Sequence, residues 1–446
     1  MINLKSLEKL ARPSNVPAAA RCIVFDGQTA VAVANALETA PWWAGVPYAQ
    51  AGVSRPVAVP MEAMKSHQLR SRHLLVDDAG LHNGAGLRTE WAADHACAGA
   101  AALLPGMPAG EPVAQCEIDL DVLDRVAIAA AVQDIRYYLK GVLLDFDAGA
   151  LVGTDGARLH CHRGGVPVVE GAGQVTVPVD AVKWLLHSVD EVAQVTVWRM
   201  ANGRAQVLLR TSDAFVFAHG LEGRYPEWQR VVPALGTCGA RFRVDPSALA
   251  GAVESMGKLH RLESGGKRGV VSLDVVAGRV HAGGGDSFHA VDVTADTGHG
   301  EAFPLYVTAD YLQDAADCVG VGARWAMPKP GKVGPAGPLL VVDGSFAAVV
   351  MPHRQPQEAD KPAAQAAPEE APAAQAAPEE APAAQAAPEE APAAQAAPEE
   401  APQPEPCPAA VDAVAAQLVA RTVAGAVSPK KARRGRASRK AEPVEA

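Results

Sequence analysis

The amino-acid sequence predicts an α+β protein made of three tandem domains, followed by a low-complexity tail. Two observations predict this architecture: an internal repeat with a period of about one domain, and an abrupt change of composition after Arg354. A chain of 446 residues with 49% hydrophobic residues can bury more than one core, and its length suggests roughly three domains. We predict domains at 1–115, 116–236 and 237–354, and a tail at 355–446.

One repeated unit is a strand that enters a helix. Residues 57–65 read VAVPMEAMK, residues 175–183 read VTVPVDAVK, and a looser copy begins at Leu305. Pro60 and Pro178 stand at the same place in the first two copies. We expect each proline in the first helical turn, where no amide donor is needed.

A second repeated unit lies upstream and begins with a helix-capping residue. Asn3, Asp119 and Asp245 occupy the same place in three related segments. Their side-chain oxygens can accept the amide hydrogens left unpaired at a helix start, and Pro246 is a favourable first helical residue. Apolar residues then recur at helical spacing, so one face of each helix is expected in the core.

Between the helices the pattern alternates with a period of two residues, which is typical of strands. Asn202-Gly203 separates two such runs, and this pair supplies the positive φ of a tight hairpin turn. Gly27, Gly278 and Gly344 separate other Val-rich runs. Each domain is thus expected to follow the order helix, strands, helix, strands.

The tail begins with four copies of the repeat PAAQAAPEEA at 362–401. Proline every few residues prevents a continuous helix, so the composition predicts an extended, flexible spacer. An Ala/Val-rich stretch at 408–427 follows, and then a basic end at 429–440.

The bulk composition restricts the class of protein. A net charge of −10 argues against coating nucleic acid with the whole surface, so a DNA partner must meet a local basic face. The seven cysteines are odd in number, scattered and never spaced as C-x-x-C, which fits reduced thiols. The N-terminus lacks a signal pattern, and no apolar run reaches membrane-spanning length. We expect a soluble, cytoplasmic protein with no membrane partner.

No convincing motif for a nucleophile, a phosphate loop or a cofactor is present, so we expect no catalytic residues, metal or cofactor. One alternative is a metal-dependent hydrolase using His160, His162 and Asp155, which a chelator would inactivate. Against it, the two histidines share one face of a strand and no second ligand cluster completes the site. Another alternative is a DNA-packaging protein that acts through the basic end.

Four segments, in order, resemble bacterial DNA polymerase III beta sliding clamps. The resemblance covers the second and third domains well, the first weakly and the tail not at all, which suggests a divergent member with an added tail. The segments are DIRYYLKGVL at 134–143, VGTDGARL at 152–159, EGRYPEWQRVVP at 222–233 and AVVMPHR at 348–354.

The resemblance implies that the three domains are DNA-clamp domains forming half of a closed ring. Two protomers would join head to tail, with helices lining the hole. Such a ring is a non-catalytic processivity factor. Its implied partners are double-stranded DNA, bound independently of sequence, a replicative DNA polymerase, a clamp loader and a second copy of the chain.

The resemblance also implies an apolar pocket between the second and third domains that takes short peptides of polymerases and clamp loaders. Taken one at a time, these residues could be ordinary strand core or turn residues. Their joint pattern favours a pocket. Ala157 stands where the family usually has His, and Lys267 where a pocket Phe is expected, so peptide preference or affinity should differ. The pocket residues carried over are Leu139, Thr154, Gly156, Arg158, Leu159, Pro226, Arg230, Val231, Tyr311, Val349, Val350, Met351, Pro352 and Arg354.

Sliding requires contacts to phosphates rather than to base edges. For each cation the alternative is an ordinary solvated charge, and for the tyrosines a place in the aromatic core. Leu262 is a candidate for the dimer contact. The DNA-binding candidates are Lys5, Lys9, Arg12, Lys65, Arg125, Arg136, Tyr137, Tyr138, Lys183 and Lys258.

Overall fold

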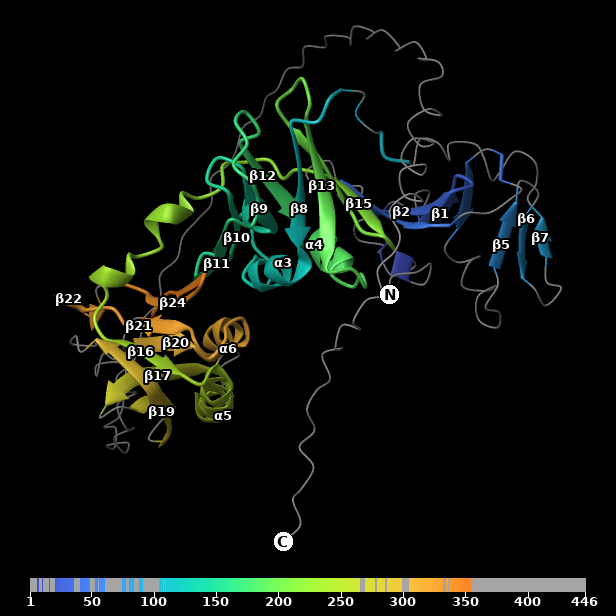
Figure 1. Cartoon of the computed structure of the whole chain (residues 1–446). Coiled ribbons are helices and arrows are strands. Elements are labelled where there is room, and N and C mark those ends of the chain that lie inside the picture. The colour runs from blue at the N-terminus through green and yellow to red at the C-terminus, as the bar shows by residue number, and fades with distance from the viewer. Residues whose placement is uncertain are drawn as a thin grey trace, which may run out of the picture. The chain divides into compact units, whose positions relative to one another are not determined.

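Figure 1 shows the computed structural model of the chain, with its helices and strands labelled. The predicted tail and its basic end lie outside the described residues, as do Asn3 and Gly278. The described residues are 6–7, 10, 16, 21–35, 41–48, 53–54, 56–60, 74–77, 80–83, 88–90, 104–106, 108, 110–264, 269–276, 279–284, 287–298, 305–331, 334–335 and 337–353.

Strands dominate the described part of the predicted first domain. Gly27 adopts φ 91° in the turn between the first two strands, as a tight hairpin turn requires. The strands are β1 (Cys22–Phe25), β2 (Thr29–Asn35), β3 (Trp42–Pro47), β4 (Val57–Pro60), β5 (Leu74–Asp77), β6 (Gly80–Asn83) and β7 (Arg88–Glu90).

The next segment follows the predicted order of helix, strands, helix, strands. Its elements are β8 (Ala114–Asp119), α3 (Leu120–Ala127), the short 3-10 helix η3 (Tyr137–Leu139), β9 (Gly141–Asp145), β10 (Ala150–Thr154), β11 (Arg158–Arg163), β12 (Gln174–Pro178), α4 (Val179–Leu185), β13 (Val192–Arg199), β14 (Ala205–Arg210) and β15 (Phe215–His219).

The last described segment repeats this order after a connection that contains two 3-10 helices. The elements are η4 (Trp228–Arg230), η5 (Leu235–Thr237), β16 (Arg241–Val244), α5 (Pro246–Ser264), β17 (Val270–Val276), β18 (Arg279–Gly284), β19 (Ser287–Gly298), β20 (Leu305–Thr308), α6 (Ala309–Asp317), β21 (Arg324–Ala326), β22 (Pro330–Gly331), β23 (Gly334–Pro335), β24 (Leu339–Asp343) and β25 (Phe346–Val350). The α+β class is confirmed, whereas the exact domain boundaries stay a prediction.

The helix starts confirm two of the predicted caps. The Asp119 carboxylate accepts hydrogen bonds from the amides of Asp121 at 2.7 Å and Val122 at 3.2 Å. Asp245 accepts one from the amide of Ser247 at 2.9 Å, at the start of α5. These bonds satisfy amides that have no partner within the helix.

The predicted passage from strand to helix is confirmed at residues 175–183, but neither proline lies inside a helical turn. Pro60 and Pro178 each end a strand, β4 and β12, and Pro178 is the N-cap of α4, one position before its first helical residue. Both strands stand at the edge of their sheets, where a residue without an amide hydrogen disrupts no ladder. The short-range pattern could not reveal this, because edge position depends on long-range pairing.

Two long antiparallel sheets connect the successive segments. The first has the order β4-β1-β2-β3-β15-β14-β13-β8, and the second β12-β9-β10-β11-β25-β24-β21-β16-β19-β18-β17-β20. In each sheet a strand of one segment, β3 or β11, pairs with the last strand of the next segment, β15 or β25. The same junction is therefore used twice along the chain.

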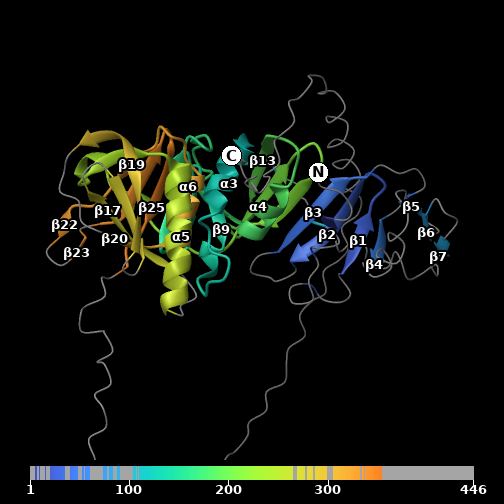
Figure 2. The same cartoon turned by 90° about the horizontal axis from the view of Figure 1, so that it is seen from below.

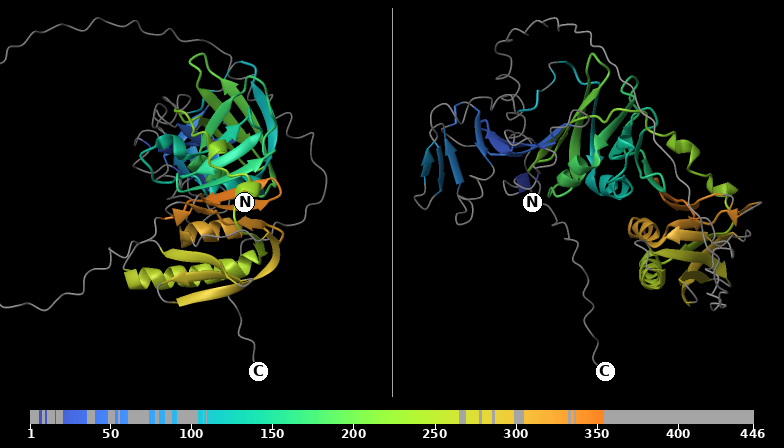
Figure 3. Two further views of the ribbon diagram at one scale, coloured as in Figure 1. Left: turned by 90° about the vertical axis from the view of Figure 1, so that its left-hand side faces the viewer. Right: turned by 180° about the vertical axis from the view of Figure 1, so that it is seen from behind.

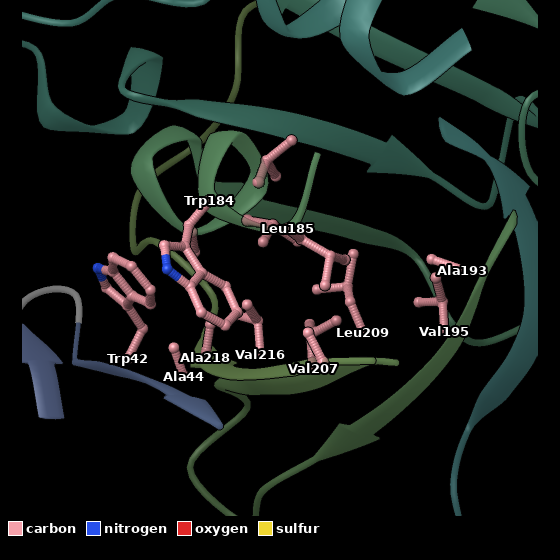
Figure 4. Close-up of a cluster of buried hydrophobic side chains, with 14 of the residues drawn as sticks. Trp42, Ala44, Trp184, Leu185, Ala193, Val195, Val207, Leu209, Val216 and Ala218 are labelled. Carbon is pink, nitrogen blue, oxygen red and sulfur yellow. The ribbon is translucent and has the colours of Figure 1, made fainter. Parts of the chain in front are cut away.

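The core crosses the first of these junctions. In register, Ala44 pairs with Val216 and Trp42 with Ala218. Figure 4 shows these side chains gathered beneath Trp184 of α4. A continuous buried cluster thus joins β3 to the sheet and helix of the following segment.

The helices lie in pairs. α3 contacts α4, and α5 contacts α6 (Figure 1). α5 also packs against β17, β18 and β19, which is visible in Figure 2 and in the left panel of Figure 3, where it lies across the yellow strands. Within the described residues, no helix combines the length and the apolar character needed to cross a bilayer.

Candidate functional site

Several of the carried-over pocket residues lie where β11 pairs with β25. Leu159 is opposite Val349, and Arg158 is opposite Val350. Successive side chains of a strand point to opposite faces of the sheet, so these two pairs lie on different sides. Leu159 and Val349 are buried in a cluster with Leu139, whereas Val350 belongs to the core of the third segment.

The connection between the second and third segments is anchored by a buried carboxylate. Trp228 in η4 is 2% exposed, and its Nε1 donates to Asp145 Oδ2 at 2.9 Å. The same carboxylate, which is fully buried, accepts from Gln174 Nε2 at 3.1 Å and from the amide of Ala148 at 3.1 Å. The anchor fixes the part of the connection that carries Pro226, Arg230 and Val231, all of which are exposed.

The turn between β10 and β11 is held by its own side chains. Thr154 Oγ1 donates to the carbonyl of Arg158 at 2.6 Å and accepts from the amide of Gly156 at 3.0 Å. Asp155 Oδ1 accepts from the amide of Ala157 at 2.9 Å. Gly156 has φ 90°, and a Cβ there would lie 2.9 Å from Arg136 Nη1. The positive φ favours glycine here, whereas the Arg136 guanidinium is the end of a flexible side chain that could move aside.

Arg158 links β11 to the third segment. Its side chain is 12% exposed, and its Nη2 donates to the carbonyl of Ile128 at 2.8 Å. It forms ion pairs with Asp155, at 3.2 Å, and with Asp314 of α6, and its guanidinium lies 4.5 Å from the ring centroid of Tyr311. The Arg158 guanidinium thus holds the second and third segments together through several simultaneous contacts. The sequence pattern did not identify Asp314, which is 156 residues away from Arg158.

The chain leaves β25 through a partly exposed apolar stretch. The amide of Met351 donates to the carbonyl of Ala157 at 2.9 Å, and the Met351 residue is 40% exposed. Pro352 is half-buried, and the His353 ring bonds to Thr308 at 2.8 Å. Met351 thus offers apolar surface beside the β10–β11 turn, and Val231, in the connection after η4, is 39% exposed. Arg354 and Lys267 lie outside the described residues.

The DNA-binding candidates fall into different environments. Arg136 is bound to Asp134 at 2.7 Å, Tyr137 is 44% exposed, and Tyr138 packs against the cluster around Leu139. The neighbouring Arg136 holds the pKa of Asp134 down to about 2. Lys183 is half-buried in the last turn of α4. Lys5, Lys9, Arg12 and Lys65 lie outside the described residues.

His160 of the hydrolase alternative occupies a closed setting, whereas His162 is half-buried. His160 is fully buried, its Nδ1 bonds to the carbonyl of Arg125 at 2.7 Å, and its ring meets Phe346 edge-on at 5.4 Å. Asp155 is already occupied by the turn and by Arg158. Among the residues that the structure describes, no group of three or more His, Cys, Asp or Glu side chains could hold a metal ion.

The strand orders, the paired helices and the repeated junction define an α+β fold of repeated sheet-and-helix units. The fold is that of solved sliding clamps. A DNA polymerase sliding clamp from Pseudomonas aeruginosa aligns with TM-score 0.59 and 19% identity, over 79% of this chain and 96% of that chain. One from Caulobacter crescentus aligns with TM-score 0.59 and 21% identity over the same shares, 79% and 96%.

Sequence similarity points to the same proteins. The beta sliding clamp of Vibrio cholerae is 32% identical over 117 residues, which are 25% of this chain and 31% of that protein. The beta sliding clamp of Pseudomonas aeruginosa is 32% identical over 125 residues, 26% and 32% of the two chains. The matched segment spans about a third of the length of these relatives. No family model matches the chain. The resemblance to bacterial beta sliding clamps is confirmed, and its low identity marks the chain as divergent.

Proposed function

We propose that the chain is a DNA sliding clamp, a non-catalytic processivity factor that encircles duplex DNA and tethers a replicative DNA polymerase. A shared fold does not by itself fix a function. The observation that carries the proposal is that the fold aligns over 96% of a sliding clamp while a separate sequence comparison finds beta sliding clamps. As a replication protein, the chain would act in the cytoplasm.

The strand edges support closure by a second copy. β3 and β11 each pair with a last strand, but their counterpart β19 pairs over Ser287–Asp292 only with β18 among the described strands. The last described strand of the first segment, β7, pairs only with β6 in the described part of the chain. We infer that β7 of one protomer joins β19 of its partner, which repeats the junction twice more and closes a head-to-tail ring.

Two exposed apolar residues lie on β19 and on α5, the helix that packs against it. Phe288 of β19 is 61% exposed, and Leu262 near the end of α5 is 83% exposed. Burial of such side chains between protomers would stabilise the closed ring, since apolar surface is removed from water. The clamp loader would have to separate this junction to admit DNA.

The tethering site is proposed at Met351, beside the β10–β11 turn, with Val231 as a second exposed apolar residue that a partner peptide would contact. Partner peptides bind best where a few apolar side chains meet a rigid support. Here the Arg158 contacts, the turn and the Trp228 anchor provide that support. The remaining pocket residues, including Leu139, Leu159 and Val349, would hold the surface in shape from beneath.

Met351→Asp should abolish tethering without unfolding the chain. Met351 is 40% exposed, so the substitution leaves the core intact, but a carboxylate would have to be desolvated against an apolar peptide. We expect stimulation of the replicative polymerase to fall by about tenfold or more. The measurement is primer extension on a closed circular template in the presence of the clamp loader.

The matched control is Val168→Asp. Val168 is also an exposed apolar residue, at 70%, but it follows β11 at the other end of that strand. This variant should stimulate extension as the wild type does. Equal stimulation by all three proteins would refute the tethering site, and no stimulation by the wild type would refute the clamp function.

A further inference from the structure

The described helices carry more acidic than basic side chains. Four residues of α3–α6 are basic and eight are acidic. The basic residues are Arg125, Lys183, Lys258 and Arg261, and the acidic residues are Asp121, Asp124, Asp180, Glu254, Glu263, Asp310, Asp314 and Asp317. In the proposed clamp these helices face the DNA, so their charge bears directly on phosphate binding.

Three of the four basic residues are engaged by the protein itself. The Arg125 guanidinium donates to the carbonyl of Cys318 at 3.4 Å and lies 5.8 Å from the centroid of the Phe346 ring. Lys258 pairs with Glu254 at 2.5 Å. Arg261 pairs with Asp310 at 3.2 Å. These contacts offset much of the positive charge that would otherwise attract phosphates.

Among the exposed residues of α3–α6, the excess of acidic over basic side chains is larger still. On α3–α6, Lys258 is the only exposed basic residue within the described chain. Six acidic residues are exposed: Asp121, Asp180, Glu254, Glu263, Asp310 and Asp317. Like charges repel over distances up to the Debye length, about 10 Å in moderate salt. These helices alone would therefore hold DNA weakly.

The chain carries a concentrated positive segment elsewhere. Seven of the eleven residues at 430–440 are Lys or Arg, and none is acidic. The repeats at 362–401 contain eight Glu and no Lys or Arg, so the two charges are separated along the chain. About 75 residues separate Arg354 from Lys430, and a fully flexible chain of that length spans about 50 Å on average. That length allows the basic end to meet DNA bound by the body.

We propose that the basic end is a second DNA-binding element, which contacts the phosphates of duplex DNA without reading sequence. This inference rests on the proposed function for its choice of DNA as the ligand. The seven cations supply the charge that the exposed faces of α3–α6 lack. Neutralised phosphates release counterions, so binding by this element depends steeply on salt.

The test compares the full chain with a variant in which all seven Lys and Arg at 430–440 are replaced by Gln. Both are titrated with a short linear duplex, by fluorescence anisotropy, over a series of salt concentrations. The slope of log affinity against log salt should fall by up to about 6, since each phosphate contact contributes about 0.9. Affinity at low salt should fall by about tenfold or more.

A chain in which residues 429–440 are shuffled keeps the charge and serves as the control. It should bind DNA as the wild type does. Equal affinity and slope for the neutralised variant and the wild type would overturn the proposal. The proposal would also be overturned if the neutralised variant lost binding to phosphatidylserine vesicles but bound DNA as the wild type does. Retention on closed circles is measured on the same proteins. If none of these proteins is retained on closed circles, the proposed clamp function is wrong. The proposal for the basic end is still tested, because it depends only on binding to the linear duplex.

Discussion

Replacing Trp228 with alanine should lower the free energy of unfolding by about 4 kcal/mol. Trp228 is 2% exposed, so the substitution leaves a large cavity beneath the connection between the second and third segments. It also removes the indole N–H that donates to the buried Asp145 carboxylate. Urea unfolding followed by circular dichroism would measure the difference.

A matched pair of phenylalanine variants separates the hydrogen bond from the cavity. Trp325 is fully buried as well, but its Nε1 has no hydrogen-bond partner among the described residues. Trp228→Phe should therefore cost about 1–3 kcal/mol more than Trp325→Phe, because only the first leaves a buried carboxylate short of a donor. Equal losses would mean that the Asp145 contact contributes nothing to stability.

Acidification should destabilise the chain through His160. Burial lowers the pKa of this histidine to about 4, from an ordinary value of about 6.5. The folded pKa lies below the unfolded one, so the unfolded chain takes up the proton first as the pH falls. The contribution of His160 is complete above pH about 6.5 and declines towards pH about 4, a loss of about 3 kcal/mol.

The measurement is the free energy of unfolding as a function of pH, for the wild type and for His160→Gln. Burial also lowers the pKa of His162 and of His219, so the variant should keep part of the dependence. Between pH about 6.5 and about 4 its slope should be smaller by about one proton. The comparison uses the slope of the free energy of unfolding against pH. A variant that is less stable by the same amount at every pH therefore has an unchanged slope. An unchanged slope would contradict the assignment.

Local features were predicted well from the sequence. The caps at Asp119 and Asp245 and the hairpin at Gly203, with φ 82°, depend on neighbouring residues, and all are confirmed. The hairpin strands pair in register from Gln194 opposite Arg210 to Arg199 opposite Ala205. Such features are encoded within a few positions of the chain, so a single sequence suffices to find them.

Features that depend on distant pairing were missed. β19 pairs with β18 over its first half and with β16 from Val293 onward, which no local pattern indicates. The Arg158–Asp314 contact likewise joins elements that only the fold brings together. For the candidate pocket, the resemblance supplied the residues, but their division between the two faces of the β11–β25 pair required the strand register.

In the proposed clamp, the chain is held on DNA by topology rather than by affinity for bases. The direct measurement is the lifetime of loaded protein on a closed circular duplex and on the same duplex cut once. We expect long retention on the circle and rapid loss from the cut molecule, at a salt concentration that suppresses phosphate binding. Equal dissociation rates from the two templates would contradict it.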